Sequence, residues 1–252
     1  MTSTTSSSEE SVAKVPHDAP RKDVPRLVAP RKHTAVLVAL ILSVFALGTW
    51  INAHKSNVPP PPLPPPSPSA RIFLVYVPML LMQWGLTAYV SRIGLPRNIL
   101  PDLIGKRWSS RSRAIADLAC AVVSFFVIIV AEWIARRLFP ERQSAPIVAL
   151  LPHSFGERAS WAVVALSVGF CEEVIFRGYL QMQFAAMSKS RTLGVVAQAV
   201  LFGMAHGEQG VGSALRIAMY AVVFGALASW RRTLIPGMLC HAAIDLVSVL
   251  GR

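Results

Sequence analysis

Two adjacent glutamates and an arginine lie within a mainly apolar part of this chain, in the sequence CEEVIFRGYL at 171–180. On a helix, Glu173 and Arg177 are four residues apart and can form an ion pair, which lowers the cost of burying both charges. Glu172 is turned from Glu173 by about 100° and has no cation within the motif. An unpaired carboxylate in apolar surroundings accepts a proton readily, so Glu172 is a candidate general base for a water molecule. The alternative is a structural ion-pair network between helices.

Two histidines occur in similar surroundings further along the chain. His206 follows Phe202 by four residues in FGMAH, and His241 precedes Asp245 by four residues in HAAID. A single histidine on an apolar helix is more often a packed core residue than a catalytic one. Helix packing does not require three separate apolar segments each to carry ionisable groups, and such groups are costly in a membrane. We therefore predict that Glu172, His206 and His241 meet in one site.

The elements that must position these groups are long apolar segments. Of the 252 residues, 53% are hydrophobic and only 15% are charged. The blocks 35–53 and 72–90 contain no Asp, Glu, Lys or Arg, and each is long enough to cross a bilayer as a helix. Further apolar blocks lie near 114–134, 159–187, 193–209, 211–230 and 234–250. This pattern predicts an all-α polytopic membrane bundle of about seven transmembrane helices.

The composition also predicts a division of the chain into parts. A Ser/Thr-rich charged stretch and the tract VPPPPLPPPSPSA at 58–70 lack the apolar residues needed for a core. We expect a disordered cytoplasmic tail at 1–33, an N-terminal transmembrane anchor at 34–53, a proline-rich linker at 54–71 and a membrane helical bundle at 72–252.

The net charge of +12 raises the question of nucleic-acid binding. The basic residues fall in short loops beside apolar segments, without a basic stripe interleaved with aromatic residues, so we predict no nucleic-acid partner. Excess Lys and Arg mark cytoplasmic loops, which predicts a plasma-membrane protein with its N-terminus, the 91–113 loop and the 188–192 loop in the cytoplasm, and the proline tract outside. Four arginines in the supposedly outer loop 135–158 are an exception to the rule, or one span is misassigned.

The chain has three cysteines, Cys120, Cys171 and Cys240, all within apolar segments. Their odd number and position do not indicate a disulfide framework. We interpret them as small buried residues. A thiol nucleophile at Cys171 is a minor alternative.

The sequences EEVIFR, FGMAH and HAAID follow one another on successive apolar segments. They resemble the E-E-x-x-x-R, F-x-x-x-H and H-x-x-x-N/D motifs of the CAAX prenyl endopeptidase and bacteriocin-processing (CPBP, or Abi) family of intramembrane endopeptidases. The resemblance covers about residues 110–250. It implies a helical membrane protease that activates water with a glutamate and a histidine, and whose partner is a membrane-associated or lipidated protein or peptide in the lipid bilayer.

The resemblance also implies a role for each matching residue. Glu172 would be the base, His206 would assist the water, and His241 would face the oxyanion of the intermediate. The residues expected to shape the site are Glu173, Arg177 and Phe202.

Asp245 departs from the family pattern, because many members have asparagine there. An amide can donate a hydrogen bond to an oxyanion, whereas an ionised aspartate would repel it. Asp245 is then protonated, or orients His241, or marks a member with different chemistry. We favour orientation of His241, because the four-residue spacing on a helix supplies that geometry.

Other functions remain open at this stage. No cofactor is expected, and the H-E-x-x-H and C-x-x-C signatures of zinc sites are missing. A zinc site formed by Glu172 or Glu173 with His206 and His241 is still conceivable. Buried Glu, His and Asp also build proton relays in transporters, although the sequence shows no internal repetition. A catalytically silent scaffold or immunity protein is the third alternative.

Overall fold

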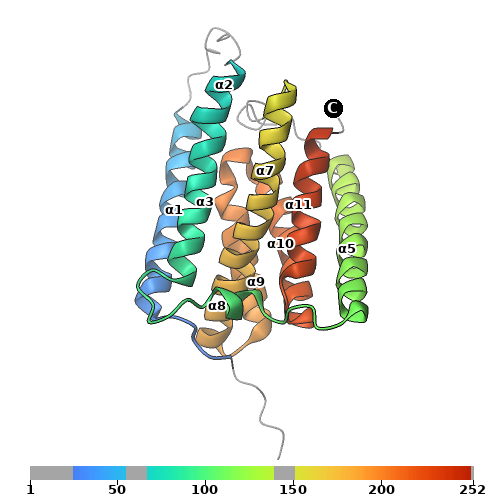
Figure 1. The fold of residues 1–252 in the computed structure, drawn as a ribbon. Helices are drawn as coiled ribbons and strands as arrows, with labels where there is room; N and C mark the ends of the chain where they lie inside the picture. Colours follow the sequence, from blue (N-terminus) through green and yellow to red (C-terminus); the bar gives the residue numbers. More distant parts are fainter. Residues whose placement is uncertain (1–24, 55–66, 139–150, 251–252) are drawn as a thin grey trace, which may run out of the picture.

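The computed structural model of the chain describes residues 25–54, 67–138 and 151–250. This described part is helical and contains no strand, apart from one isolated bridge between Gly105 and Thr233. The predicted all-α membrane bundle is therefore confirmed (Figure 1). The expected tail up to residue 24 and most of the proline tract lie outside the described residues.

The apolar blocks of the sequence each form a helical segment. Five segments are long and apolar enough to cross a membrane, and two shorter apolar helices complete the bundle. The long segments are α1 (Arg31–Ala53), α2–η1–α3 (Pro68–Arg71, Ile72–Tyr76 and Val77–Ser91), α5 (Arg111–Leu138), α7–η2–α8 (Phe155–Glu172, Glu173–Leu180 and Gln181–Ser188) and α10 (Val211–Arg231). The shorter helices are α9 (Arg191–Ala205) and α11 (Ile235–Leu250), and two short turns of helix are α4 (Leu100–Ile104) and η3 (Gly207–Gln209).

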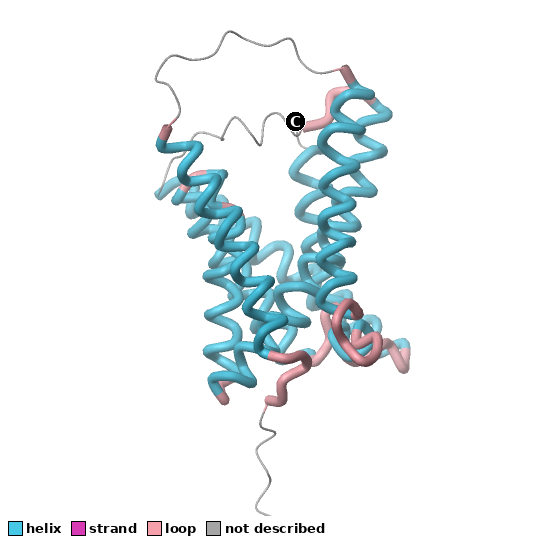
Figure 2. The backbone as a smooth tube through the Cα atoms, turned by 90° about the vertical axis from the view of Figure 1, so that its left-hand side faces the viewer, coloured by secondary structure: helices cyan, strands magenta, loops and turns pink. Residues whose placement is uncertain are grey.

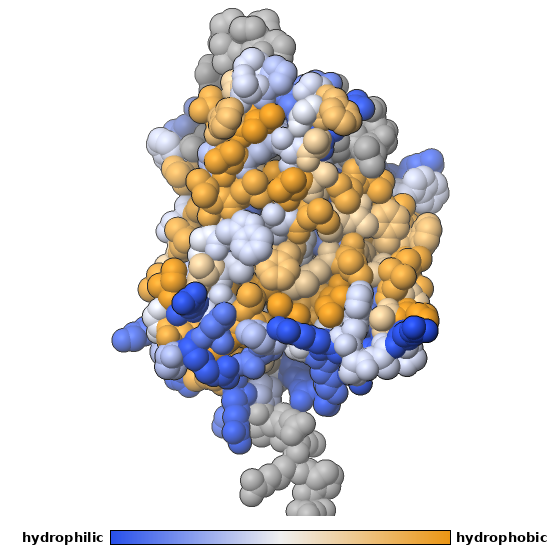
Figure 3. Space-filling view, in the orientation of Figure 1, coloured by the Kyte–Doolittle hydropathy of each residue, from blue (hydrophilic) through white to orange (hydrophobic). Residues whose placement is uncertain are grey.

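The surface pattern is that of an integral membrane protein. On the face drawn in Figure 3, hydrophobic side chains form a broad band, and hydrophilic side chains gather below it. Large exposed apolar residues such as Leu74, Ile115 and Trp230 are 67–74% exposed. Such side chains are stable at the surface when lipid covers them, and helices satisfy their own backbone hydrogen bonds there.

Three connections and the start of the first helix share one end of the bundle, which we call the basic end. They are the start of α1, the loop between α3 and α5, the α8–α9 turn and the α10–α11 link (Figure 1). The exposed basic residues there include Arg26, Arg92, Lys106, Lys189, Arg191 and Arg232. The helices form two groups that lie close together at this end and separate toward the other (Figure 2).

The helix expected to be a separate anchor packs against the rest of the bundle. α1 begins at Arg31 and contacts α9 and η3. The segment before it is fastened by the buried amide of Gln183, whose oxygen accepts from the backbone N–H of Val28 (2.8 Å) and whose nitrogen donates to the hydroxyl of Thr34 (2.5 Å). A fully buried amide requires such partners. The described part of the expected tail, 25–33, is therefore packed onto α8.

A buried histidine joins α1 to two further elements. The ring of His33 stacks on Tyr89 at 4.0 Å between centroids. Its Nε2 lies 3.0 Å from the carbonyl oxygen of Ile93 and its Nδ1 lies 2.7 Å from the hydroxyl of Tyr179. Because a carbonyl only accepts, Nε2 donates to Ile93, and in the tautomer with its one proton on Nε2 the ring accepts from Tyr179 through Nδ1. α1 is thereby linked to α3 and η2.

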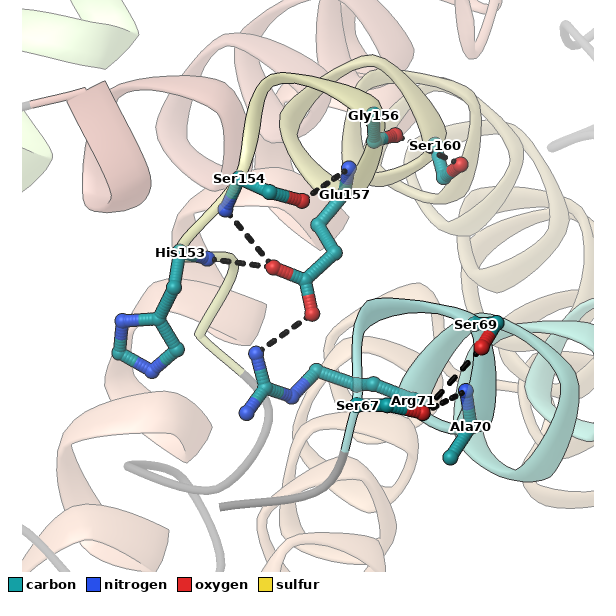
Figure 4. A network of polar contacts seen from close by, with 9 residues as sticks. All are labelled: Ser67, Ser69, Ala70, Arg71, His153, Ser154, Gly156, Glu157 and Ser160. Atoms are coloured by element: carbon teal, nitrogen blue, oxygen red, sulfur yellow. Dashed lines mark hydrogen bonds and ion pairs between the residues drawn. The ribbon is translucent and has the colours of Figure 1, made fainter.

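A buried ion pair fastens α2 to the start of α7 at the opposite end (Figure 4). Arg71 Nη1 lies 2.7 Å from Glu157 Oε1, and both side chains are almost fully buried. Glu157 Oε2 accepts from the backbone N–H groups of His153 and Ser154 at 2.8 Å each. Ser154 caps α7 in return, which completes a capping box. The element that follows the proline tract is thus held on the helix that carries the EEVIFR motif.

Ion pairs at both ends of α5 hold it against α10. Near the basic end, the fully buried carboxylate of Asp117 accepts from Arg231 Nη2 (2.6 Å) and from Trp108 Nε1 (3.0 Å). Toward the other end, Glu132 lies 3.5 Å from Arg216 and accepts from the hydroxyl of Tyr220. These contacts hold α5 and α10 together beside the helices that carry the motifs.

Candidate active site

The motif EEVIFR lies where α7 changes into a π-helix. Glu172 is the last residue of α7, and η2 runs over Glu173–Leu180 with every residue buried. The N–H of Gln181 bonds to the carbonyl of Phe176, five residues earlier. A π-helix has a wider turn than an α-helix, so the angle of about 100° between neighbouring side chains does not carry over. The sequence predicted a regular α-helix here, and π-turns are frequent at functional sites.

Glu172 has one oxygen fixed and one without a partner. Its Oε1 accepts a hydrogen bond from Gln83 Nε2 at 2.8 Å, and both side chains are buried. Its Oε2 is buried and makes no hydrogen bond within the described part of the chain. Gln83 belongs to α3, far from the motifs in sequence. None of the three motifs pointed to Gln83, although a lone glutamine inside the apolar block 72–90 is a signal of a buried polar contact.

His241 lies among three carboxylates. Its Nδ1 is 3.2 Å from Glu173 Oε1 and makes a hydrogen bond to it. Its Nε2 is 3.7 Å from Glu172 Oε2 and 3.8 Å from Asp245 Oδ2. The structure thus brings together Glu172, Glu173, His241 and Asp245, which the sequence placed on two different helices.

Close helix packing makes these distances attainable. A Cβ atom on Gly169 of α7 would lie 2.8 Å from the backbone nitrogen of Ala242 on α11. A Cβ atom on Gly237 would lie 2.7 Å from Glu173 Oε2. Contacts under 3.0 Å do not occur for real Cβ atoms, so only glycine permits α11 to lie this close to α7 and to the glutamate.

Asp245 does not hydrogen-bond to His241. Its separation of 3.8 Å from Nε2 is beyond hydrogen-bond range, and Glu173 makes the bond to Nδ1 instead. The backbone oxygen of Asp245 accepts from Trp161 Nε1 at 3.1 Å, which ties α11 to α7. The four-residue spacing brings the side chains of Asp245 and His241 to the same side of α11 but leaves them short of direct contact.

His206 lies at the margin of the site, at the point where α9 ends. Its Nδ1 is 2.8 Å from the carbonyl oxygen of Phe202. That oxygen can only accept, so Nδ1 carries the proton, and the Nε2 of a neutral ring keeps its lone pair. Asp245, which lies 3.8 Å from His241 Nε2, is close enough to His206 for their charges to interact, so His206 borders the same group of side chains.

The rings of Phe202 and Phe224 pack against the guanidinium group of Arg177. Arg177 Nη1 lies 3.2 Å from Glu173 Oε1, so the predicted ion pair is present, and both side chains are fully buried. The guanidinium carbon also lies 4.3 Å from the ring centroid of Phe202 and 5.2 Å from that of Phe224. Such cation–π contacts offset part of the cost of burying the arginine. Phe224 stacks on His241 at 5.5 Å; no motif pointed to Phe224.

One comparison with known proteins gives a match. Residues 154–247 match the family described as type II CAAX prenyl endopeptidase Rce1-like, and this segment contains all three motifs. This match supports the predicted resemblance to the CPBP family, and we call residues 154–247 the CPBP segment. No curated protein and no solved structure matches the chain. The match begins at the N-cap of α7, so it is shorter than the predicted resemblance over 110–250.

The CPBP segment supplies every motif residue of the site, whereas the side chain that hydrogen-bonds to Glu172 comes from outside the segment. Gln83, which holds Glu172, belongs to α3, and α3 is tied to α1 through Tyr89 and His33. The helices before the CPBP segment therefore complete its site.

Histidine, cysteine and carboxylate side chains are the usual protein ligands of a metal ion such as zinc. Within the ranges that the structure describes, no group of three or more His, Cys, Asp and Glu side chains is arranged to hold one. Cys171 and Cys240 are free and buried, as expected, and Cys120 is partly exposed. The site contains a carboxylate with an oxygen that makes no hydrogen bond within the described residues, a histidine beside it and a second histidine whose Nδ1 is bonded to the backbone.

Proposed function

We propose that this protein is an intramembrane endopeptidase that hydrolyses a peptide bond of a membrane-associated or lipidated protein with water activated by Glu172. The observation that carries the proposal is the state of the Glu172 carboxylate. Gln83 fixes one oxygen at 2.8 Å, and the other is buried without a hydrogen-bond partner among the described residues, 3.7 Å from His241. An oriented carboxylate with a free oxygen is suited to accept a proton from water.

The proposed reaction follows from the positions of the two histidines. Glu172 takes a proton from water as the water oxygen attacks the carbonyl carbon, and His206 positions the water through its free Nε2. His241 donates from Nε2 to the oxyanion. The proton then passes from Glu172, directly or through His206, to the leaving nitrogen as the carbon–nitrogen bond breaks.

Two acidic groups orient His241 in this scheme. Glu173 accepts from Nδ1 at 3.2 Å and fixes the plane of the ring. Asp245 lies 3.8 Å from Nε2 and acts on the ring through its charge rather than through a hydrogen bond. This is the role we propose for the aspartate that replaces the family's usual asparagine.

Comparative peptidomics tests the proposal and identifies the substrate. Membranes from cells with the native protein are compared with membranes carrying the Glu172→Gln variant at equal abundance. We expect a set of peptides, with new termini on membrane-associated proteins, only with the native protein. The exposed Glu208 provides a control, because Glu208→Gln should leave the set unchanged. Identical peptides in all three membranes would favour the non-catalytic scaffold.

We further propose that cleavage needs no metal ion. Prolonged chelation of the purified protein followed by gel filtration should leave the cleavage rate unchanged, because Glu172 alone activates the water in this scheme. Loss of activity on chelation with recovery on adding equimolar zinc would contradict it. Glu172, His206 and His241 would then be interpreted as zinc ligands.

We propose that the protein lies in the plasma membrane with the basic end in the cytoplasm, since exposed Lys and Arg concentrate there. In a variant without native cysteines, Lys189→Cys should react with a membrane-impermeant reagent only after cells are permeabilised. Ser67→Cys, before α2 at the opposite end, should react in intact cells. The opposite labelling pattern would reverse the orientation.

A further inference from the structure

A cavity of about 360 Å³ opens at the basic end, away from Glu172. Its wall is formed by the segment before α1, by α4, by α8, by the first residue of α9 and by the α10–α11 link. Arg177 and Gln181 of η2 and α8 also line it. The volume is within the usual range for small-molecule sites, which begins at roughly 300 Å³. Residues outside the CPBP segment, from the stretch before α1 and from α4, therefore contribute to this cavity as well.

The cavity is strongly basic. Its described lining includes Arg26, Arg177, Arg191 and Arg232, with Asp102 as its acidic member. Asp102 is already paired with Arg97 outside the lining, at 2.6 Å. Within the described ranges, no ion pair is formed by the three exposed arginines of the set, which are Arg26, Arg191 and Arg232. Such a group of cations attracts an anion, and arginine is the side chain best matched to phosphate.

The buried arginine of the set has unused hydrogen-bond donors. Arg177 is fully buried, and its Nε, Nη1 and Nη2 make no hydrogen bond within the described part of the chain. Its contact with Glu173 at 3.2 Å is an ion pair of imperfect geometry. Buried donors are normally paired. The guanidinium in the lining is thus ion-paired with Glu173 but keeps N–H donors that make no hydrogen bond within the described residues.

Two of the exposed arginines occupy distinctive backbone positions. Arg191 is the first residue of α9, after the N-cap Ser190, where the helix presents free N–H groups and favours an anion over a cation. Arg232 has a left-handed conformation, with φ of 55°, and its carbonyl accepts from the backbone N–H of Lys106 at 3.0 Å. A left-handed non-glycine residue persists only when its surroundings hold it there. The backbone of Arg232 is therefore held in place, and Arg191 lies beside free N–H groups that favour an anion.

An apolar groove is formed by α8 and α9, which also contribute residues to the basic cavity. A second cavity, of about 400 Å³, is lined by side chains of α8 and α9 that include Phe184, Leu193 and Val196. Leu193 and Val196 are 55% and 45% exposed at the surface that faces lipid. This groove offers an acyl chain a place near the basic cavity.

We propose that the basic cavity binds a phosphate group, supplied by the headgroup of an anionic phospholipid or by a free phosphate ion. Basic pockets between membrane helices on the cytoplasmic side commonly hold such headgroups. The neighbouring apolar groove favours the lipid as the source. The inference does not depend on the proposed protease activity.

The test measures binding to the purified full-length protein in an uncharged detergent. Short-chain phosphatidylglycerol, phosphatidylcholine of the same chain length and inorganic phosphate are added separately, and binding is followed by the unfolding temperature and by native mass spectrometry. We expect phosphatidylglycerol to bind tightly with one molecule per protein and phosphatidylcholine to bind at least tenfold more weakly. Inorganic phosphate should compete with phosphatidylglycerol.

Matched variants locate the site. Arg191→Gln with Arg232→Gln should weaken phosphatidylglycerol binding at least tenfold. The control, Arg92→Gln with Arg111→Gln, removes two exposed arginines near the same end but outside the cavity lining and should not change binding. If the first pair prevents folding, Arg26→Gln, which lies on a non-helical segment, provides the same test with a smaller loss.

The outcomes separate the two sources. Tighter binding of phosphatidylglycerol than of inorganic phosphate supports a lipid site, and equal binding of the two, lost in the arginine variant, supports a site for free phosphate. Equal binding by the arginine variant and its control, or equal binding of both lipids, would overturn the proposal.

Discussion

Replacing Glu172 with glutamine is expected to lower the rate of peptide-bond cleavage by about 10²–10⁴-fold, the usual contribution of a positioned general base. The change keeps the size of the side chain, and the amide oxygen can still accept the hydrogen bond that Gln83 donates at 2.8 Å. The fold and the abundance in the membrane should therefore be unchanged. What is lost is the ability of Oε2 to take a proton from water.

The measurement is the initial rate of cleavage of a peptide found by the peptidomic comparison, with the purified protein in detergent. The unfolding temperature of each variant is recorded in parallel. Glu208→Gln, the same chemical change at an exposed position, should have the native rate. If Glu172→Gln cleaves at the native rate, Glu172 is not the base and the proposed mechanism fails.

Replacing Arg177 with methionine is expected to destabilise the protein by about 3–5 kcal/mol, the usual cost of removing one partner of a buried ion pair. Arg177 and Glu173 are fully buried side by side. Without the arginine, Glu173 would keep the Nδ1–H of His241 as its remaining described hydrogen bond. The buried carboxylate, without its arginine partner, would then oppose folding.

The double variant Glu173→Gln/Arg177→Met separates charge from packing. It leaves no unpaired charge, so it should be more stable than Arg177→Met alone while cleavage stays low, because Glu173 no longer orients His241. Detergent-solubilised variants are compared by their unfolding midpoints, and Arg92→Met, at an exposed position, should change stability by less than about 0.5 kcal/mol. If Arg177→Met is as stable as the native protein, the ion pair between Arg177 and Glu173 does not stabilise the fold.

Local features of the sequence predicted the helices and part of the site. A run of about 20 apolar residues has few stable conformations in a bilayer other than a helix, and each predicted apolar block forms one. The i, i+4 spacing of Glu173 and Arg177 was enough to predict their ion pair, since partners on the same helical segment lie close without any long-range fold.

The N-terminal part was harder to interpret from composition. A proline tract separates α1 from the bundle in sequence, which suggested an independent anchor. The buried amide of Gln183 nevertheless holds residues 28–34 across a separation of 149–155 positions. Composition describes whether a segment can form a core by itself, and it contains no information on whether another segment offers a matching surface.

The sequence by itself determined that this is a helical membrane protein with Glu172, His206 and His241 on three apolar segments, because hydrophobic length and motif spacing are local properties. Only the tertiary structure decided which atoms meet. It paired Gln83 with Glu172 across 89 positions, gave the hydrogen bond of His241 to Glu173 instead of Asp245, and widened the motif into a π-helix. These contacts depend on how closely α3, α7 and α11 pack. That packing is fixed by small residues and buried polar groups on different helices, whose mutual fit has no local signature in the sequence.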